Sequence, residues 1–419
     1  MNIVLTKSYG KASRFGIGAY IDMLIAAFST CPDHELIVAH INTCDRNVLK
    51  ECTGNTTHIF IPRNNDFGKH TVQDEIYIDF PFAGTIYSIL YDHLGGRHPD
   101  ILHLNSPLEV NIARTARERG NAFILYTVHV LLWNILYNQD FERFSHDWEN
   151  NESNVKTTSI RLEMDLCDLA SRIICLTPGA RSFVADFYKT PFEKIDLVHN
   201  GIVITPGAFL SADMKKGIRK KYGFPERITI IYSGRLIYEK GLDFLIEALD
   251  RLHKKDIGFH LIVCGDGDYS YYLDKCAGFT GKVSFVGFVG KDRLYDLYRL
   301  ADIGVLVSLS EQNSFSVLEM MSFGVPVVVT DNEAFRHLKG DREVAVFIPL
   351  LEKNRVDVSA LEKRLEWLIK SRTARDRVGS SSKTMIMQRF TVNDVKREME
   401  RVYLLKPAAT DSGCNPWDS

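Results

Sequence analysis

The sequence lacks long apolar runs. No stretch approaches the roughly 18 to 20 consecutive apolar residues that a helix needs to span a bilayer. The first ten residues, MNIVLTKSYG, have the pattern of a short strand and not that of a signal peptide. We therefore expect a cytoplasmic protein, whose only membrane contact would be peripheral, at the inner membrane.

The sequence also has no large excess of basic or of acidic residues. The 51 Lys and Arg residues are balanced by 53 Asp and Glu residues, which gives a formal net charge of −2 and predicts no nucleic-acid partner. The local exception is the cationic run Lys215–Lys221. It is compatible with a phosphate or membrane contact, but a solvated helix face is the commoner origin of such a run and is our preferred interpretation.

Several metal and cofactor signatures are absent. The eight cysteines form no C-x-x-C pair, and no Cys/His set has zinc spacing, so free thiols in a reducing compartment are expected. No G-x-x-x-x-G-K-[S/T] loop is present, which argues against ATP or GTP hydrolysis. The pair Asp266-x-Asp268 could bind a metal, but Asp is also a common turn former between glycines. We expect no metal and no cofactor.

Short apolar runs alternate with helical patterns along the chain, which predicts parallel, doubly wound α/β sheets. The clearest helix pattern spans residues 242–252, with leucines and one isoleucine on one face. The expected strands are Ile3–Leu5, Leu36–Ile41, His58–Ile61, Ile101–Leu104, Phe123–Val128, Arg172–Leu176, Ile195–Val198, Ile228–Tyr232, Phe259–Cys264, Val283–Val286, Ile303–Val307, Val325–Val329 and Val344–Ile348.

A chain of 419 residues is too long for one core, and these strands divide evenly around residue 204. We predict two Rossmann-like domains, residues 1–204 and 205–390. A helix over 391–405 should pack on one of them, and the tail 406–419 should be disordered. Ligands bind beyond the carboxyl ends of strands in such sheets, so the two domains would face each other across a central cleft.

Two candidate sites follow expected strands of the N-terminal domain. Gly16 and Gly18 open a helix after the first strand, where the backbone can approach an anion closely. The third glycine of a dinucleotide fingerprint is missing, which disfavours NAD, and an ordinary tight turn fits equally well. His129 ends the strand Phe123–Val128. Lone histidines are usually structural, but this position facing the cleft favours a ligand contact.

The C-terminal domain offers a pair of cations. Arg235 and Lys240 bracket the loop after the strand Ile228–Tyr232, with Gly234 and Gly241 beside them. Two fixed cations at a helix N-terminus would clamp a diphosphate. Ordinary surface residues are the alternative, and the flanking glycines favour the clamp.

The stretch SEQNSFSVLEMMSFGVPVVVTD places two carboxylates, Glu311 and Glu319, between two expected strands. Ser314 should cap the intervening helix and Gly324 should close it. Glu311 would then lie at the rim and Glu319 about one and a half turns into the helix. A polar ligand could be held at both carboxylates, with phosphates on the backbone N–H groups between them. A capping box with an unrelated loop Glu fits equally well.

In order and spacing, these features resemble the GT-B fold retaining glycosyltransferases of family 4, the glycosyl transferases group 1. The likeness covers nearly the whole chain. It rests on the glycine loop Phe15–Gly18, T-x-H at Thr127–His129, H-N-G-I at His199–Ile202, G-R-L-x-x-x-K-G at Gly234–Gly241 and E-x7-E at Glu311–Glu319.

The resemblance implies transfer of a sugar from a nucleotide-diphosphate donor to an acceptor hydroxyl, with retention of configuration and without a metal ion. A UDP-sugar is the favoured donor and a GDP-sugar the alternative. Arg235 and Lys240 would hold the diphosphate, Glu311 and His129 would contact the donor sugar, and Glu319 would bind the ribose. The remaining donor-site residues would be Gly16, Gly18, Gly234, Ser314, Phe315 and Ser316.

The sequence departs from the family pattern in two loops. The family's Phe-Gly stands two residues after the first Glu, whereas here Phe315 comes four residues after Glu311 and precedes Ser316. The Gly-Gly after the next strand is replaced by Asp331-Asn332-Glu333. The resemblance therefore does not name the donor sugar.

Other functions remain open at this stage. A nucleotide-sugar 2-epimerase shares the fold and the donor, a non-catalytic nucleotide-sugar-binding scaffold would keep the same site, and a Rossmann oxidoreductase is weaker. A glycan, a lipid-linked glycan, a peptide or a small molecule could supply the acceptor hydroxyl. The aromatic segment Leu131–Asn154 could form an acceptor wall or could be helix packing.

Overall fold

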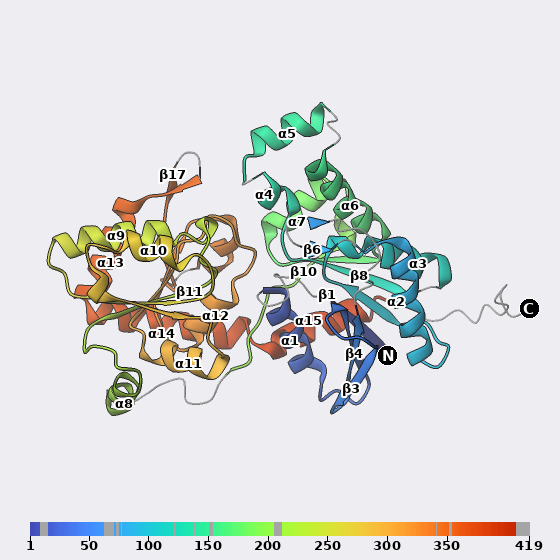
Figure 1. Cartoon of the computed structure of the whole chain (residues 1–419), viewed down its shortest axis with the longest axis horizontal. Coiled ribbons are helices and arrows are strands. Elements are labelled where there is room, and N and C mark those ends of the chain that lie inside the picture. The colour runs from blue at the N-terminus through green and yellow to red at the C-terminus, as the bar shows by residue number, and fades with distance from the viewer. Residues whose placement is uncertain are drawn as a thin grey trace, which may run out of the picture.

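The computed structural model consists of two α/β domains, each built around a parallel sheet (Figure 1). The structure describes residues 1–8, 16–62, 71–72, 75–76, 78–120, 122–137, 139–150, 154–204, 212–340, 342–351 and 354–407. Phe15 of the glycine loop, the expected boundary at residue 205 and the tail from residue 408 lie outside the described residues.

The first sheet has the strand order β10-β9-β8-β7-β1-β2-β4-β3, and only β3 runs antiparallel to its neighbour among these strands as described. Its strands are β1 (Asn2–Ser8), β2 (Glu35–Thr43), β3 (Leu49–Thr53), β4 (Thr56–Pro62), β7 (Ile101–Leu104), β8 (Phe123–Val128), β9 (Arg172–Cys175) and β10 (Ile195–Leu197). The accompanying elements are α1 (Gly16–Phe28), β5 (Thr71–Val72), β6 (Glu75–Ile76), α2 (Phe80–His93), α3 (Val110–Arg119), α4 (Leu132–Leu136), α5 (Phe141–Glu149), α6 (Val155–Leu169) and α7 (Pro178–Asp186).

The second sheet has the order β13-β12-β11-β14-β15-β16, and its described strands are all parallel. Its strands are β11 (Thr229–Ser233), β12 (His260–Cys264), β13 (Val283–Gly287), β14 (Ile303–Leu306), β15 (Val327–Thr330) and β16 (Val346–Ile348). The accompanying elements are α8 (Ala212–Tyr222), α9 (Leu242–Lys254), α10 (Tyr269–Lys275), α11 (Lys291–Leu300), α12 (Phe315–Ser322), β17 (Leu350–Leu351), β18 (Arg355–Val356), α13 (Val358–Lys370), α14 (Arg372–Arg389) and α15 (Val392–Tyr403).

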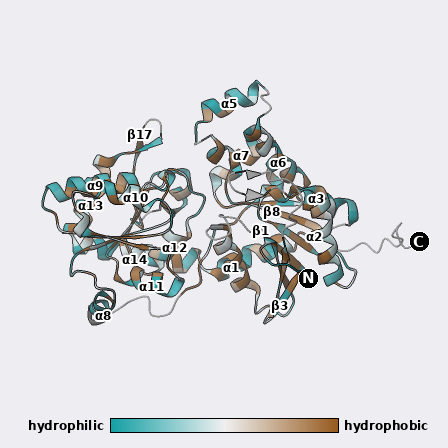
Figure 2. Ribbon diagram, viewed as in Figure 1, coloured by the Kyte–Doolittle hydropathy of each residue, from teal (hydrophilic) through white to brown (hydrophobic). Residues whose placement is uncertain are grey.

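Alternating side chains of the strands divide the N-terminal core into two layers. Val4 of β1 packs with helices α2, α3 and α6, whereas Ile3 and Leu5 pack on the opposite face with α1 and α15. This division follows from the period of two in a strand. In both domains the strands are mainly hydrophobic and the outward faces of the helices are mainly hydrophilic (Figure 2). Helices therefore cover both faces of the sheet, as doubly wound folds require.

The chain crosses between the domains a second time near its end. Helix α15 follows α14 of the C-terminal domain but packs against α1 of the N-terminal domain, with Met399, Val402 and Tyr403 buried beside Phe28 (Figure 1). Gly201 lies on the first crossing, between β10 and α8, and an added Cβ would stand 2.5 Å from the carbonyl oxygen of Thr391 on the second crossing. A glycine is therefore required where these two connecting segments meet.

All thirteen expected strands are present, with bounds that differ by at most a few residues. The sequence interpretation missed β3, whose five residues are all exposed and so carry no apolar pattern. In the described part of the chain, no helix combines the length and the apolar character that crossing a membrane would require.

Candidate active site

The C-terminal domain brings its candidate residues to the point where the strand order reverses. Strand β11 lies between β12 and β14, so the chain winds outward from it in both directions. Gly234 and Arg235 follow β11, and Glu311 follows β14. Open α/β sheets bind ligands in the crevice between two such strand ends.

Lys240 and Glu311 form an ion pair at this edge, with 2.5 Å between Nζ and Oε1. Both side chains are mostly buried. The loops that carry them are fastened together, because Ser308 Oγ and Leu309 N both donate to the carbonyl oxygen of Glu239 at 2.9 and 2.8 Å. The geometry therefore holds the cation and the carboxylate in a fixed relation.

Gly241 makes this loop possible. Lys240 ends the 3-10 turn η4 (Tyr238–Lys240), and Gly241 then adopts φ +76° before α9 begins. A Cβ at this position would stand 2.0 Å from the carbonyl oxygen of Val307. Only glycine combines that backbone conformation with so close an approach.

Arg235 lies exposed on the same edge of the sheet. Its backbone is held by the Tyr232 hydroxyl, which donates to the Arg235 carbonyl oxygen at 2.7 Å. The preceding Gly234 donates its N–H to Cys264 O at 3.0 Å. The side chain can therefore reach a ligand from a rigid loop.

Glu319 lies deeper, on α12, and is only 5% exposed. It accepts hydrogen bonds from Lys291 Nζ and, at 3.5 Å, from the Tyr298 hydroxyl. Burial raises the pKa of its carboxyl, and the neighbouring Lys291 opposes that shift. The sequence interpretation missed Lys291, because a lysine at a helix N-terminus carries no signal of its own.

The expectation that Ser314 caps α12 with its side chain was wrong. Ser314 stands at the N-cap position, and its carbonyl oxygen accepts from Leu318 N at 3.1 Å, but its side chain makes no capping hydrogen bond. Gly324 does follow the helix with φ +73°. Phe315 packs against the cores of both domains, and Ser316 hydrogen-bonds Tyr298.

In the N-terminal domain, His129 follows β8 and is partly exposed. Its Nε2 lies 3.0 Å from Asn105 Oδ1, and its ring meets Tyr20 of α1 edge-on at 4.6 Å between centroids. Burial lowers the pKa of His129 to about 3, so the ring is neutral at physiological pH. A neutral imidazole can exchange hydrogen bonds with sugar hydroxyls.

A buried carboxylate missed by the sequence interpretation anchors this arrangement. Glu109 is fully buried between β1 and β7, where the order of the first sheet reverses. It accepts from Thr6 Oγ1 at 2.6 Å, Ser8 Oγ at 2.7 Å and Asn105 N at 2.9 Å. Burial raises the pKa of this carboxyl, and the hydrogen bonds oppose the shift.

The two glycines of the first loop lie on α1. Gly18 is buried within the helix, whereas Gly16 is exposed at its first residue. A Cβ on Gly16 would meet no described atom within 4 Å. The described residues therefore give no steric reason for a glycine at position 16. Neither the ligand contact nor the tight turn is favoured by them.

The carboxyl edges of the two sheets meet at a seam. Thr177, after β9, donates to Gln312 Oε1 at 3.0 Å, and Asn200 Nδ2 donates to the carbonyl oxygen of Asn313 at 2.7 Å. The loop between Glu311 and Glu319 therefore contacts the other domain directly. It is the loop in which Phe315 stands four residues after Glu311 and not two.

Other candidate features have structural roles. Asp266 and Asp268 both accept hydrogen bonds from nearby backbone N–H groups, as turn formers do. In the run Lys215–Lys221, three cations pair with Asp302 or Asp296. The aromatic segment is largely packing, because Phe144 is fully buried and Trp133 stacks on it at 5.6 Å.

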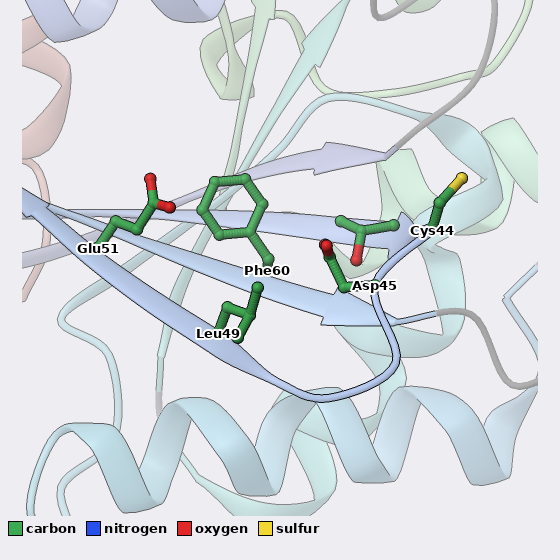
Figure 3. A pocket seen from close by; sticks show the side chains of 6 residues that line it. Cys44, Asp45, Leu49, Glu51 and Phe60 are labelled. Atoms are coloured by element: carbon green, nitrogen blue, oxygen red, sulfur yellow. The ribbon is translucent and has the colours of Figure 1, made fainter.

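A separate pocket of about 250 Å³ lies at the far edge of the first sheet (Figure 3). Strands β2, β3 and β4 and the β2–β3 connection supply its lining, which includes Asp45, Leu49, Glu51 and Phe60. None of the candidate site residues lines it. It is therefore distinct from the seam.

Comparisons with known proteins identify the family of this chain. The family model for Glycosyltransferase Family 4 matches residues 16–205, and that for Glycosyl transferases group 1 matches residues 214–385. An uncharacterized glycosyltransferase of Methanocaldococcus jannaschii is 34% identical over 166 residues, 38% of this chain and 42% of that protein. The alpha-D-kanosaminyltransferase of Streptomyces kanamyceticus is 27% identical over 186 residues, 43% of this chain and 47% of that protein. The matched regions thus span less than half the length of these relatives.

Solved structures share the fold across both domains. Sucrose-phosphate synthase from Thermosynechococcus elongatus superposes with a TM-score of 0.75 at 17% identity, covering 96% of this chain and 98% of its own. An Anabaena protein in complex with UDP and glucose gives 0.71 at 18% identity, covering 96% and 99%.

Proposed function

This chain belongs to the GT-B glycosyltransferases, and on that premise we propose that it transfers a sugar from a nucleoside-diphosphate donor to an acceptor hydroxyl. The observation that carries the proposal is the Lys240–Glu311 pair at the strand-order reversal of the second sheet. Arg235 lies on the same edge, and Glu319 lies one helix turn and a half deeper.

Each group has a role that its chemistry suits. Lys240 and Arg235 neutralise the diphosphate and the charge that grows on it as the glycosidic bond breaks, which is the work a metal ion would otherwise do. Glu311 binds hydroxyls of the donor sugar, and Glu319 binds those of the ribose. Glu311 also holds the Lys240 ammonium in place by their 2.5 Å contact.

The N-terminal domain completes the site from the other side of the seam. His129 supplies a neutral hydrogen-bonding group to the donor sugar. The acceptor hydroxyl approaches from this domain, and the departing phosphate oxygen takes its proton. This course retains the anomeric configuration, and it needs from the protein mainly positioning and charge stabilisation.

The donor is proposed to be a UDP-sugar. The Anabaena protein of the same fold was solved with UDP and glucose, and further structures of it hold UDP or UDP-glucose. The acceptor is a hydroxyl of a glycan, a lipid-linked glycan or a peptide. The small-molecule acceptors named for relatives, such as inositol phosphate, belong to those proteins.

A binding panel tests the proposal. The purified chain is heated with UDP-, GDP- and ADP-sugars and with free nucleotides, in the presence of EDTA. A ligand at about 100 times its Kd adds about 2.7 kcal/mol of stability, so one nucleotide series should raise the Tm clearly. Failure of every nucleotide sugar to do so, with or without Mg²⁺, would refute the donor assignment.

A further inference from the structure

Cys31, His34 and Glu400 lie together on the side of the N-terminal domain away from the seam. Cys31 and His34 belong to the connection between α1 and β2, at the amino end of the sheet, and Glu400 belongs to α15. One potential ligand atom from each residue lies within 4.8 Å of the other two. Cys31 and Glu400 are 369 residues apart, so no spacing in the sequence could reveal the cluster.

The cluster has the character of a site for a positive ion. Cys31 is 8% exposed, and its Sγ lies 3.9 Å from Glu400 Oε1. The Nδ1 atom of His34 is buried and has no hydrogen-bond partner among the residues that the structure describes. A buried imidazole nitrogen without a partner is unfavourable, and an ion could supply one.

The backbone around the two N-terminal ligands is fixed. Asn55 Nδ2, in the turn between β3 and β4, donates to the carbonyl oxygens of both Cys31 and His34, at 2.8 and 3.3 Å. The His34 ring also meets Phe28 edge-on at 5.8 Å between centroids. Such supporting contacts orient metal ligands before the ion binds.

A lysine side chain lies beside the cluster. Lys396, one helix turn before Glu400, pairs with that carboxylate at 3.9 Å and hydrogen-bonds Cys31. Its side chain is partly exposed and can swing into solvent. The thiol and the carboxylate therefore attract positive charge, and the lysine is a competitor that an incoming ion can displace.

We propose that Cys31, His34 and Glu400 bind a borderline-soft divalent ion of the Zn²⁺ class and thereby fasten α15 to the N-terminal domain. A thiolate, an imidazole and a carboxylate are the ligands that Zn²⁺ prefers, and water fills the fourth position. Ligand atoms in such a site lie roughly 3.5 Å apart, given metal–ligand bonds of about 2.0 to 2.3 Å. The three ligand atoms lie within 4.8 Å of one another, so their side chains must rotate toward a common centre as the ion binds. As the Zn–S bond forms, the Cys31 thiol releases its proton to solvent.

The ion would act on stability and not on sugar transfer. The cluster lies at the amino end of β2, whereas the candidate active site lies at the carboxyl ends of the strands. Helix α15 is the segment that returns from the C-terminal domain, so the ion would secure the second crossing. The inference is independent of the proposed function.

Metal titration of the reduced full chain tests this inference, after EDTA treatment and dialysis. We expect one Zn²⁺ bound per chain by elemental analysis and a Tm that rises with Zn²⁺ concentration. Co²⁺ should give a thiolate-to-metal charge-transfer absorption. Cys31→Ser should abolish that absorption, and Cys52→Ser, at an exposed cysteine outside the cluster, should leave it unchanged.

Three further variants separate a built site from a reactive thiol. Asn55→Ala should weaken Zn²⁺ binding, because Asn55 fixes the backbone that carries Cys31 and His34. Glu400→Gln should weaken it at least as much, and Lys396→Ala, at a partly exposed position, should strengthen it. The proposal is overturned if the wild-type chain binds no stoichiometric metal, if Cys31→Ser keeps the Co²⁺ absorption, or if Glu400→Gln binds Zn²⁺ like the wild type.

Discussion

Asn105 determines which nitrogen of His129 carries the proton. The Asn105 Nδ2 donates to the carbonyl oxygens of Thr6 at 3.0 Å and His103 at 3.3 Å, so its Oδ1 is the atom that faces His129. An oxygen can only accept, so His129 Nε2 donates and Nδ1 is left as an acceptor. Glu109 holds the Asn105 backbone in this position.

Replacing Asn105 by Asp should therefore change the titration of His129. A carboxylate 3.0 Å from Nε2 favours the imidazolium and should raise the pKa of His129 from about 3 by about one to three units. The pH dependence of the His129 Cε1–H signal in NMR spectra measures this. Asn332→Asp, in the other domain, is the control, and an unmoved His129 pKa in Asn105→Asp would show that the contact is absent in solution.

Arg235 and Glu311 should both be needed for turnover. Arg235→Ala and Glu311→Ala should each lower kcat by about 10² to 10³, the scale for loss of one preorganised electrostatic contact. Steady-state rates with the donor identified by the binding panel measure this. Lys221→Ala, on the exposed face of α8, should behave as the wild type. Rates near wild type in both Arg235→Ala and Glu311→Ala would contradict the roles proposed for these residues.

Glu319 should bind the ribose of the nucleotide. Its carboxylate is buried and now bonded to Lys291 and Tyr298, so ribose hydroxyls would exchange with these partners. Hydrogen bonds to a charged group contribute about 1.5 to 3 kcal/mol, or roughly a 10- to 100-fold change in affinity. Calorimetry should show UDP binding tighter than its 2′,3′-dideoxy analogue by that factor in the wild type. The difference should vanish in Glu319→Ala, and a persistent difference would contradict the assignment.

Glu163 should make stability fall as the pH rises. This fully buried carboxyl accepts from Tyr188, Tyr126 and Leu132 N, and burial raises its pKa from 4.5 to about 7. Between these values the unfolded chain releases the proton while the folded chain keeps it, so folding loses free energy with rising pH. The loss approaches about 3 kcal/mol by neutral pH.

Urea denaturation at pH 4.5 and pH 7.5 measures this effect. The free energy of unfolding should fall with pH in the wild type by more than in Glu163→Gln, which cannot titrate at this position. The difference between the two proteins isolates Glu163 from other titrating groups. Equal pH dependence in both would contradict the raised pKa.

The sequence predicted the fold, and it predicted that Lys240 and Glu311 lie at one edge of the second sheet, because those signals are local. Buried strands are short apolar runs, and the residues after them lie at the sheet edge in any doubly wound fold. Lys240 and Glu311 are 71 residues apart, yet both follow neighbouring strands and so meet.

Features that depend on side-chain orientation or on distant segments could not be predicted. Glu109 and Thr6 are 103 residues apart and meet only because β7 pairs with β1. Ser314 occupies the N-cap position, yet its hydroxyl makes no capping hydrogen bond, which the local sequence could not show. Strand β3 was not predicted, because all five of its residues are exposed and it has no apolar face.

Lys240 should act on a nucleotide-sugar donor at this site. The most direct test measures release of the nucleoside diphosphate from the donor that binds, in EDTA, by the wild type and by Lys240→Ala. We expect the wild type to release it and the variant to do so about 100-fold or more slowly. Equal rates, or a bound donor that the wild type never cleaves with any acceptor, would contradict it.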